Sequence, residues 1–134
     1  MKYLLYFFLI CYIPVNAQNI RFKAENKWVL PIGRDSEPTQ VLKHPLRVEL
    51  KDKKLKLYYP DLNKFYFKEL VTPIKRIVEL EDDNRKFYLL EFEYEGLTFY
   101  FRITKDADPN YGALWGIEIP VIKNGQVVAY ETFY

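Results

Sequence analysis

The chain contains little of what enzyme and cofactor sites are built from. Its 134 residues include one cysteine, one histidine and one serine, which are Cys11, His44 and Ser36. Nucleophilic catalysis needs an activated hydroxyl or thiol beside a base, and zinc sites need several Cys or His ligands. The five glycines form neither a phosphate-binding loop nor a dinucleotide fingerprint. We therefore expect a protein that is not an enzyme and has no cofactor.

Disulfide bridges and glycosylation signals are also missing. Because Cys11 is the only cysteine, the chain forms no internal disulfide, and it contains no Asn-x-Ser/Thr acceptor. The bulky Ile10 directly before Cys11 disfavours lipidation at that cysteine. Small domains secreted by eukaryotic cells usually rely on disulfides. These absences favour a bacterial envelope protein.

The first 17 residues have the pattern of a cleavable signal peptide. Lys2 gives a positive start, and residues 3–13 form an apolar run. Residues 15–17 are small, or of a type that is accepted, at the positions before a signal-peptide cleavage site. The apolar run is shorter than the roughly 20 residues of a membrane-spanning helix, so an uncleaved anchor is the less favoured alternative. We predict a signal peptide at 1–17 and a single domain at 18–134. The location is then periplasmic or extracellular, with no stable membrane span after cleavage.

The charge balance gives no reason to expect nucleic acid as a partner. Lysine and arginine number 20 against 18 aspartates and glutamates, so the formal net charge is +2. The lysines are scattered and alternate with apolar residues, which is more typical of solvated strand faces than of a phosphate-binding stripe. Aromatic residues make up 18% of the chain. They favour strands, and their rings can also line a ligand groove.

Apolar and polar residues alternate with a period of two from residue 46 onward, which predicts antiparallel hairpins. In the first hairpin this register pairs Leu50 with Leu55, and in the second it pairs Phe92 with Phe99. Pro120 cannot donate a ladder hydrogen bond, so its strand should be an edge there or should bulge. The predicted hairpins are 46–59 around Asp52-Lys53, 86–104 around Glu95-Gly96, and 115–134 around Asn124-Gly125.

These strands predict an all-β fold: a single antiparallel meander of about eight or nine strands. Residues 64–70 are predicted as a strand, although apolar residues at 62, 65, 66 and 70 also fit one face of a helix. The meander forms either a small closed barrel, lipocalin-like in architecture only, or a two-sheet sandwich. We favour the barrel.

Three groups of residues are candidates for chemistry, and for each a structural interpretation is favoured. A simple register of the last hairpin places Glu118 opposite Glu131, as a carboxylate pair would need, unless a bulge shifts it. His44 lies in a Lys-His-Pro turn and is expected to titrate in solvent. Asp106, Asp108 and Asn110 have the spacing of calcium ligands, but the glycine and the final glutamate of a calcium loop are missing.

We expect the protein to bind a small hydrophobic or glycan-like ligand, since an exported, aromatic-rich chain without catalytic groups suits binding. The turn-rich segment 105–115 is the predicted contact loop. The alternative is a protein interaction module, an inhibitor or an assembly subunit, that docks through strand edges or an aromatic face such as residues 130–134. The oligomeric state stays open. The predicted ligand-binding residues are Asp106, Asp108, Asn110, Tyr111 and Trp115.

Overall fold

The structure is a computed structural model that describes residues 19–33, 37–41, 43–60, 67–82, 85–108 and 112–134. These residues form eleven strands, and among them no helix is long and apolar enough to cross a membrane. The strands are β1 (Ile20–Ala24), β2 (Lys27–Pro31), β3 (Thr39–Val41), β4 (Leu46–Lys51), β5 (Lys54–Pro60), β6 (Phe67–Pro73), β7 (Arg76–Asp82), β8 (Arg85–Tyr94), β9 (Leu97–Asp108), β10 (Gly112–Lys123) and β11 (Gln126–Phe133).

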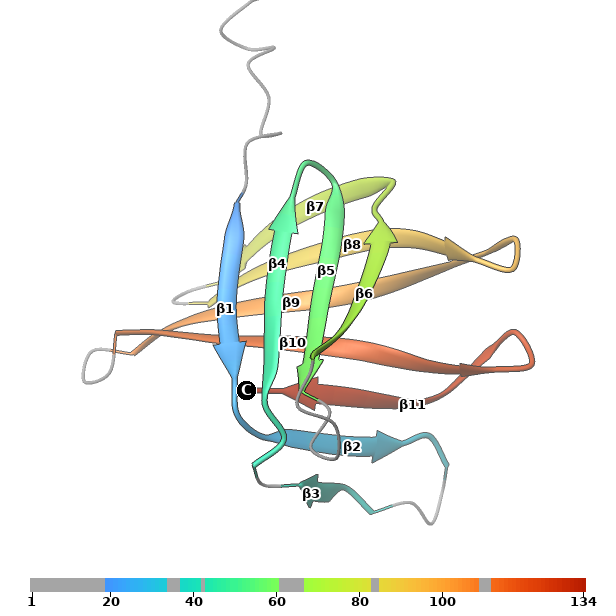
Figure 1. The fold of residues 1–134 in the computed structure, drawn as a ribbon, viewed down its shortest axis with the longest axis horizontal. Coiled ribbons are helices and arrows are strands. Elements are labelled where there is room, and N and C mark those ends of the chain that lie inside the picture. The colour runs from blue at the N-terminus through green and yellow to red at the C-terminus, as the bar shows by residue number, and fades with distance from the viewer. Residues whose placement is uncertain (1–18, 34–36, 42, 61–66, 83–84, 109–111) are drawn as a thin grey trace, which may run out of the picture.

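The strands form two antiparallel sheets that share one core. Sheet A has the order β1-β4-β5-β6, and sheet B has the order β3-β2-β11-β10-β9-β8-β7. In Figure 1 sheet A lies in front and its strands cross those of sheet B behind it. The all-β prediction is confirmed, and of the two predicted architectures the structure has the two-sheet, sandwich-like one. The favoured barrel is wrong, because edge strands β1 and β6 of sheet A do not pair with edge strands β3 and β7 of sheet B.

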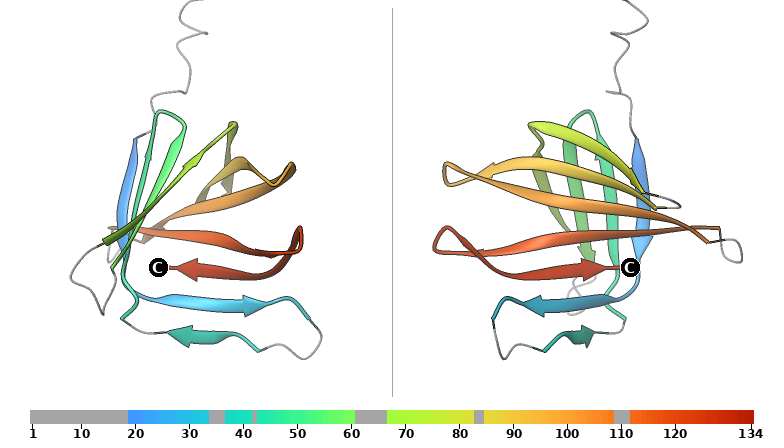
Figure 2. Two further views of the ribbon diagram at one scale, coloured as in Figure 1. Left: turned by 45° about the vertical axis from the view of Figure 1, so that its right-hand side comes forward. Right: turned by 180° about the vertical axis from the view of Figure 1, so that it is seen from behind.

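The chain passes between the sheets at three short connections: from β1 to β2, from β3 to β4, and from β6 to β7. Figure 2 shows the chain turning at these corners from one layer into the other. Such corners are typical of sheets whose strands cross. They interrupt the predicted meander and explain why it does not close on itself.

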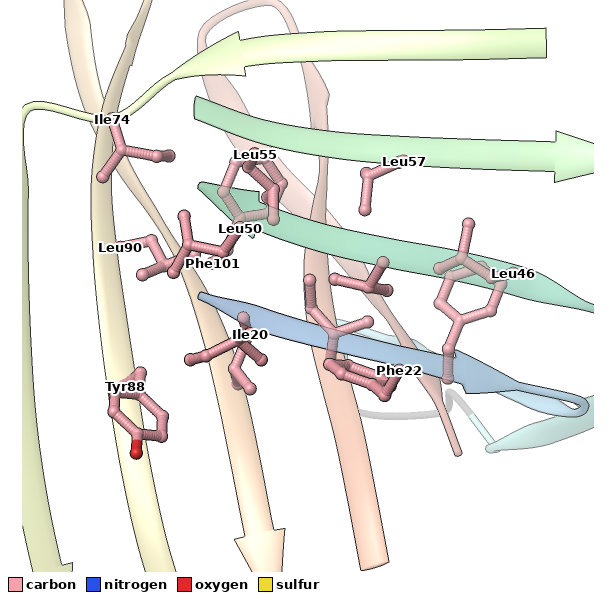
Figure 3. Packing of buried hydrophobic residues seen from close by; sticks show 14 of the residues in the cluster. Ile20, Phe22, Leu46, Leu50, Leu55, Leu57, Ile74, Tyr88, Leu90 and Phe101 are labelled. Carbon is pink, nitrogen blue, oxygen red and sulfur yellow. The ribbon is translucent and has the colours of Figure 1, made fainter. Parts of the chain in front are cut away.

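Each sheet contributes one apolar face to the core. In β4, Leu46 and Leu50 are buried while their neighbours reach the outer face. From sheet B, Leu90 and Ile103 are fully buried. Figure 3 shows side chains of the two sheets meeting in one cluster. Full burial of one such side chain contributes about 1.5–3 kcal/mol, so the contact between the sheets is the main source of stability.

The first two predicted hairpins are confirmed in register. Leu50 lies opposite Leu55, and Phe92 lies opposite Phe99. In all three two-residue turns, both central residues have positive φ, between 51° and 77°. This geometry matches the right-handed twist of paired strands. Residues 67–70 belong to β6, which confirms a strand for the described part of 64–70; residues 61–66 lie outside the described residues.

The third hairpin contains a bulge that changes its register. Pairing is simple next to the turn, but it shifts between Val121 and Ile122, so that Glu118 lies opposite Thr132 and Glu131 lies opposite Ile119. The extra residue in β11 moves Glu131 to the face that meets sheet A. The predicted opposition of Glu118 and Glu131 is therefore wrong, and the alternative of a bulge is confirmed.

β11 is an interior strand of sheet B. It pairs with β10 on one side and with β2 on the other, and Phe133 is completely buried. The idea that residues 130–134 form an unprotected terminal edge is therefore wrong. Pro120 behaves as expected, because β10 pairs with β9 only as far as Glu118 and Pro120 lies beyond that point.

Deleting residues 130–134 should abolish folding. The deletion removes Phe133 from the core and takes away most of the residues that join β10 to β2. Circular dichroism and thermal melting of the truncated protein check this expectation. A truncated protein that melts cooperatively near the wild-type temperature would contradict it.

Tyr59 lies between the sheets beside a charged pair. Its ring is 6.4 Å from the Phe133 ring in an edge-on contact, and Glu131, which faces it, forms an ion pair with Lys27 at 3.8 Å. Burial, with a smaller contribution from the Glu131 carboxylate, raises the pKa of Tyr59 to about 12. The folded protein therefore favours the neutral phenol.

This shift predicts a loss of stability in alkaline solution. In the unfolded chain Tyr59 ionises near its ordinary pKa of about 10, so its contribution is complete below that pH and is lost as pH rises toward 12. The loss is about 2 kcal/mol. Denaturant unfolding of wild type and Tyr59→Phe between these pH values measures it, and Tyr59→Phe should lose less stability. Equal losses in the two proteins would show that Tyr59 is not responsible.

Candidate functional site

A groove crosses the outer face of sheet B, the face toward the viewer in the right-hand view of Figure 2. Its volume is about 390 Å³, and it lies over β8, β9, β10 and the end of β11. None of the residues that line it is a Cys, His or Ser. They are Arg85, Phe87, Arg102, Thr104, Asp106, Leu114, Trp115, Gly116, Thr132, Phe133 and Tyr134.

Gly116 forms the floor of this groove. It lies in the interior of β10, opposite Thr104 of β9, where any other residue would project a side chain into the groove. A Cβ atom at this position would come within 3.1 Å of the Phe133 carbonyl oxygen. Glycine within a strand often marks a place where another group approaches closely. The hollow thus depends on the absence of one side chain.

Arg85, Arg102 and Asp106 form the polar side of the groove, around the Phe87 ring. The Arg102 Nη2 atom lies 2.8 Å from Glu118 Oε2, and Arg85 Nε lies 2.7 Å from Asp106 Oδ1. The two guanidinium carbons are 5.9 Å and 5.8 Å from the centre of the Phe87 ring. The cations therefore contact both a carboxylate and the ring, which holds their donors in defined directions.

Thr132 carries a polar atom that the fold leaves unused. Its Oγ1 is buried and has no hydrogen-bond partner among the described residues. Thr132 lies between Glu118 of β10 and Trp28 of β2 on the outer face. Farther along, the Gln40 amide donates a hydrogen bond to the Tyr134 hydroxyl. A buried hydroxyl without a partner costs stability, so Thr132 is a candidate ligand contact.

Of the five predicted site residues, the structure brings two to the groove. Segment 105–115 is mostly paired strand, since Asp106 lies opposite Leu114 and Asp108 opposite Gly112; the prediction of a long loop is wrong. Asp106 and Trp115 border the groove. Asn110 and Tyr111 lie outside the described residues, as does the Asp108 side chain.

Trp115 faces the core rather than the groove opening. Its ring stacks on Phe22 of sheet A, with ring centres 5.6 Å apart and planes inclined by 14°. The Lys105 ammonium lies 5.1 Å from its centre. Strand alternation places the Trp115 side chain on the face opposite to that of Gly116. Trp115 therefore supports the groove from below by joining the sheets.

Asp106 and His44 both make contacts within the fold, although the buried His44 Nδ1, like Thr132 Oγ1, lacks a hydrogen-bond partner among the described residues. Asp106, the first candidate calcium ligand, is bound to Arg85, and the described residues contain no group of three metal-binding side chains. His44 was expected in solvent, but it is half-buried and its ring centre lies 5.8 Å from that of Phe133. Its backbone N–H donates to the Glu25 carbonyl oxygen. The expectation of a solvated loop histidine is therefore wrong.

Sequence reasoning missed most of the groove. In the sequence, Phe87 and Arg102 are simply alternate residues of the second hairpin. Without the bulge, Thr132 would be assigned to the wrong face of β11. The one available signal was Gly116, a lone glycine inside a strand of apolar residues. It could have marked β10 as the centre of a hollow.

Replacing Thr132 with valine should leave the protein equally stable or raise its free energy of unfolding by about 1 kcal/mol, because the buried hydroxyl has no partner. Denaturant unfolding measures this change. Thr104→Val, a second threonine of the groove, is the matched control and should change stability little. A loss of 1 kcal/mol or more in Thr132→Val alone would show that the hydroxyl is hydrogen-bonded in the fold.

The chain matches no protein-family model, no curated protein and no solved structure.

Proposed function

We propose that this chain is an exported, non-enzymatic β-sandwich protein that binds a glycan-like ligand in the groove over Gly116. The observation that carries the proposal is the buried, unpartnered Thr132 hydroxyl in a groove that also contains an aromatic ring and two arginines, each held in an ion pair. A hydroxyl that the fold leaves without a partner can be satisfied by a ligand hydroxyl. Binding is thus favoured over a structural role for this face.

Charge and shape favour a glycan over a hydrophobic ligand. A sugar ring offers apolar C–H groups on its faces and hydroxyl groups around its edge. Phe87 supplies an apolar surface, while Arg102 and Asp106 supply a donor and an acceptor within the same groove. A purely hydrophobic ligand would leave the ion pairs desolvated without new partners, which is unfavourable. The groove is also open to solvent, as suits one unit of a longer chain.

The absence of an enzymatic role is part of the proposal. Asp106, which lines the groove, and Glu118, which binds the groove residue Arg102, each form a short ion pair with an arginine. A general acid needs a carboxyl group whose pKa is raised by burial or by a second carboxylate. Each of these carboxylates is already held by its arginine. Both groups are therefore better suited to orienting a ligand than to transferring a proton.

The alternative function, a protein interaction module, is supported by an exposed edge strand of sheet B. β7 is an edge strand of sheet B and exposes Leu80. An exposed edge of this kind can pair with a strand of a partner. It is the second candidate because charged residues flank Leu80 on both sides, and charged residues on edge strands usually prevent such pairing.

A glycan array probed with the labelled domain 18–134 should identify oligosaccharides that bind. For one of these, Phe87→Ala should weaken binding about tenfold or more, as expected when an aromatic ring that the ligand covers is removed. Thr132→Val should weaken it without loss of stability. Isothermal titration calorimetry measures both affinities.

Tyr94→Ala is the matched control, since Tyr94 is an exposed aromatic residue of the same strand near the hairpin tip, away from the groove. It should bind like wild type. Equal affinities for Phe87→Ala and wild type, or equal losses in Phe87→Ala and Tyr94→Ala, would contradict a site in this groove.

A further inference from the structure

The outer face of sheet A carries more positive than negative charge among the described residues. Strand alternation directs six cationic side chains from three adjacent strands to this face, and among the described residues its acidic side chains are Glu49 and Glu69. The surplus is four positive charges, although the whole chain carries a formal net charge of only +2. The six residues, here called the basic face, are Arg21, Lys23, Arg47, Lys51, Lys54 and Lys56.

The four lysines of the basic face lack an acidic partner among the described residues. Arg21 forms an ion pair with Glu49 at 3.5 Å, and the Arg47 guanidinium lies 6.0 Å from the Tyr58 ring centre. The four lysines form no ion pair with any described residue. Glu49 lies in register with both Arg21 and Lys56, so it partly offsets charge only in the middle of the face.

The arrangement works against the stability of sheet A. Lys23 lies directly opposite Arg47, and Lys51 lies directly opposite Lys54. Like charges in directly opposed positions of two strands are destabilising. A fold selected for stability alone would pair cations with carboxylates here. The repulsion indicates that the positive surface itself has a use.

Lys53 strengthens this argument. It occupies the second position of the β4–β5 turn with φ = 56°, where the other two turns have Gly96 and Gly125. A lysine is strained at positive φ and glycine is not. The chain therefore places a further cation at the rim of the basic face, at a position where glycine is the less strained residue.

We infer that the basic face docks the protein on the surface of an anionic phospholipid bilayer. The cations are spread over three strands, about 4.8 Å apart, and along alternate residues, about 7 Å apart. They therefore form a broad patch, which suits a planar array of headgroups. In Figure 1 this face is toward the viewer, and no described element covers it. Beside it on β6, Val71 is half exposed and can enter the interfacial region.

A linear polyanion fits this surface less well. Such a polymer is matched by a row or groove of cations, whereas these are distributed in two dimensions. Single-stranded nucleic acid also needs several exposed rings on which successive bases stack, and Tyr58 is the one aromatic residue with a described side chain that strand alternation places on this face. The membrane is therefore the partner that the geometry favours. This inference is independent of the groove on sheet B.

Vesicle sedimentation with domain 18–134 tests the inference. One vesicle is phosphatidylcholine alone, and in the other one third of the lipid is phosphatidylglycerol. The protein should bind the anionic vesicle and not the neutral one. Raising the salt concentration from about 0.1 M to about 1 M shortens the Debye length from about 10 Å to about 3 Å and should release the protein.

Charge variants locate the surface. A lysine close to an anionic membrane contributes about fivefold in affinity, so Lys51→Gln with Lys54→Gln should weaken vesicle binding about 25-fold. Lys53→Gly should weaken it about fivefold while raising the melting temperature, because the strain at positive φ is relieved. Lys43→Gln with Lys123→Gln removes the same charge elsewhere and is the control.

Thermal melting of each variant confirms that it is folded. The inference is overturned if neutral and anionic vesicles bind equally, or if the control pair loses as much affinity as the Lys51 and Lys54 pair. It is also overturned if the protein binds soluble dextran sulfate through these lysines but binds no vesicle. That last result would identify a soluble polyanion as the partner.

Discussion

The burial of one face of each sheet against the other is the constraint on which the rest of this structure depends. Fully buried side chains such as Leu46 from sheet A and Ile103 and Ile117 from sheet B meet in one cluster. Because side chains alternate along a strand, fixing this set in the core also fixes the other set on the outside. The two outer faces are therefore determined by the same packing that gives stability.

The two outer faces differ in charge. On sheet B, the arginines of the groove are matched by Glu118 and Asp106, so the surface is polar but balanced. On sheet A, lysines oppose other cations across neighbouring strands, so the surface is strongly positive. The proposed roles follow from this difference: defined polar contacts for a small ligand on one side, and attraction to an extended anionic surface on the other.

Local pattern was enough to predict the hairpins but not the site. The partners of Leu50 and Phe92 follow from alternation and from a two-residue turn. The bulge near Val121 and the pairing of β11 with β2 depend on contacts between residues far apart in sequence. Since the groove joins residues from four strands, and the bulge decides which β11 residues face it, it could not be assembled from the sequence. The lysines look scattered in the sequence for the same reason. They lie on one face only because of the register between β1, β4 and β5.

The most direct test of the central claim, a ligand held in the groove of sheet B, is native mass spectrometry of the protein isolated from its natural source. The protein should carry a carbohydrate mass that leaves under mild activation, and the Phe87→Ala variant isolated in the same way should carry much less. A protein that carries only a protein partner, or no bound mass at all, would contradict the account.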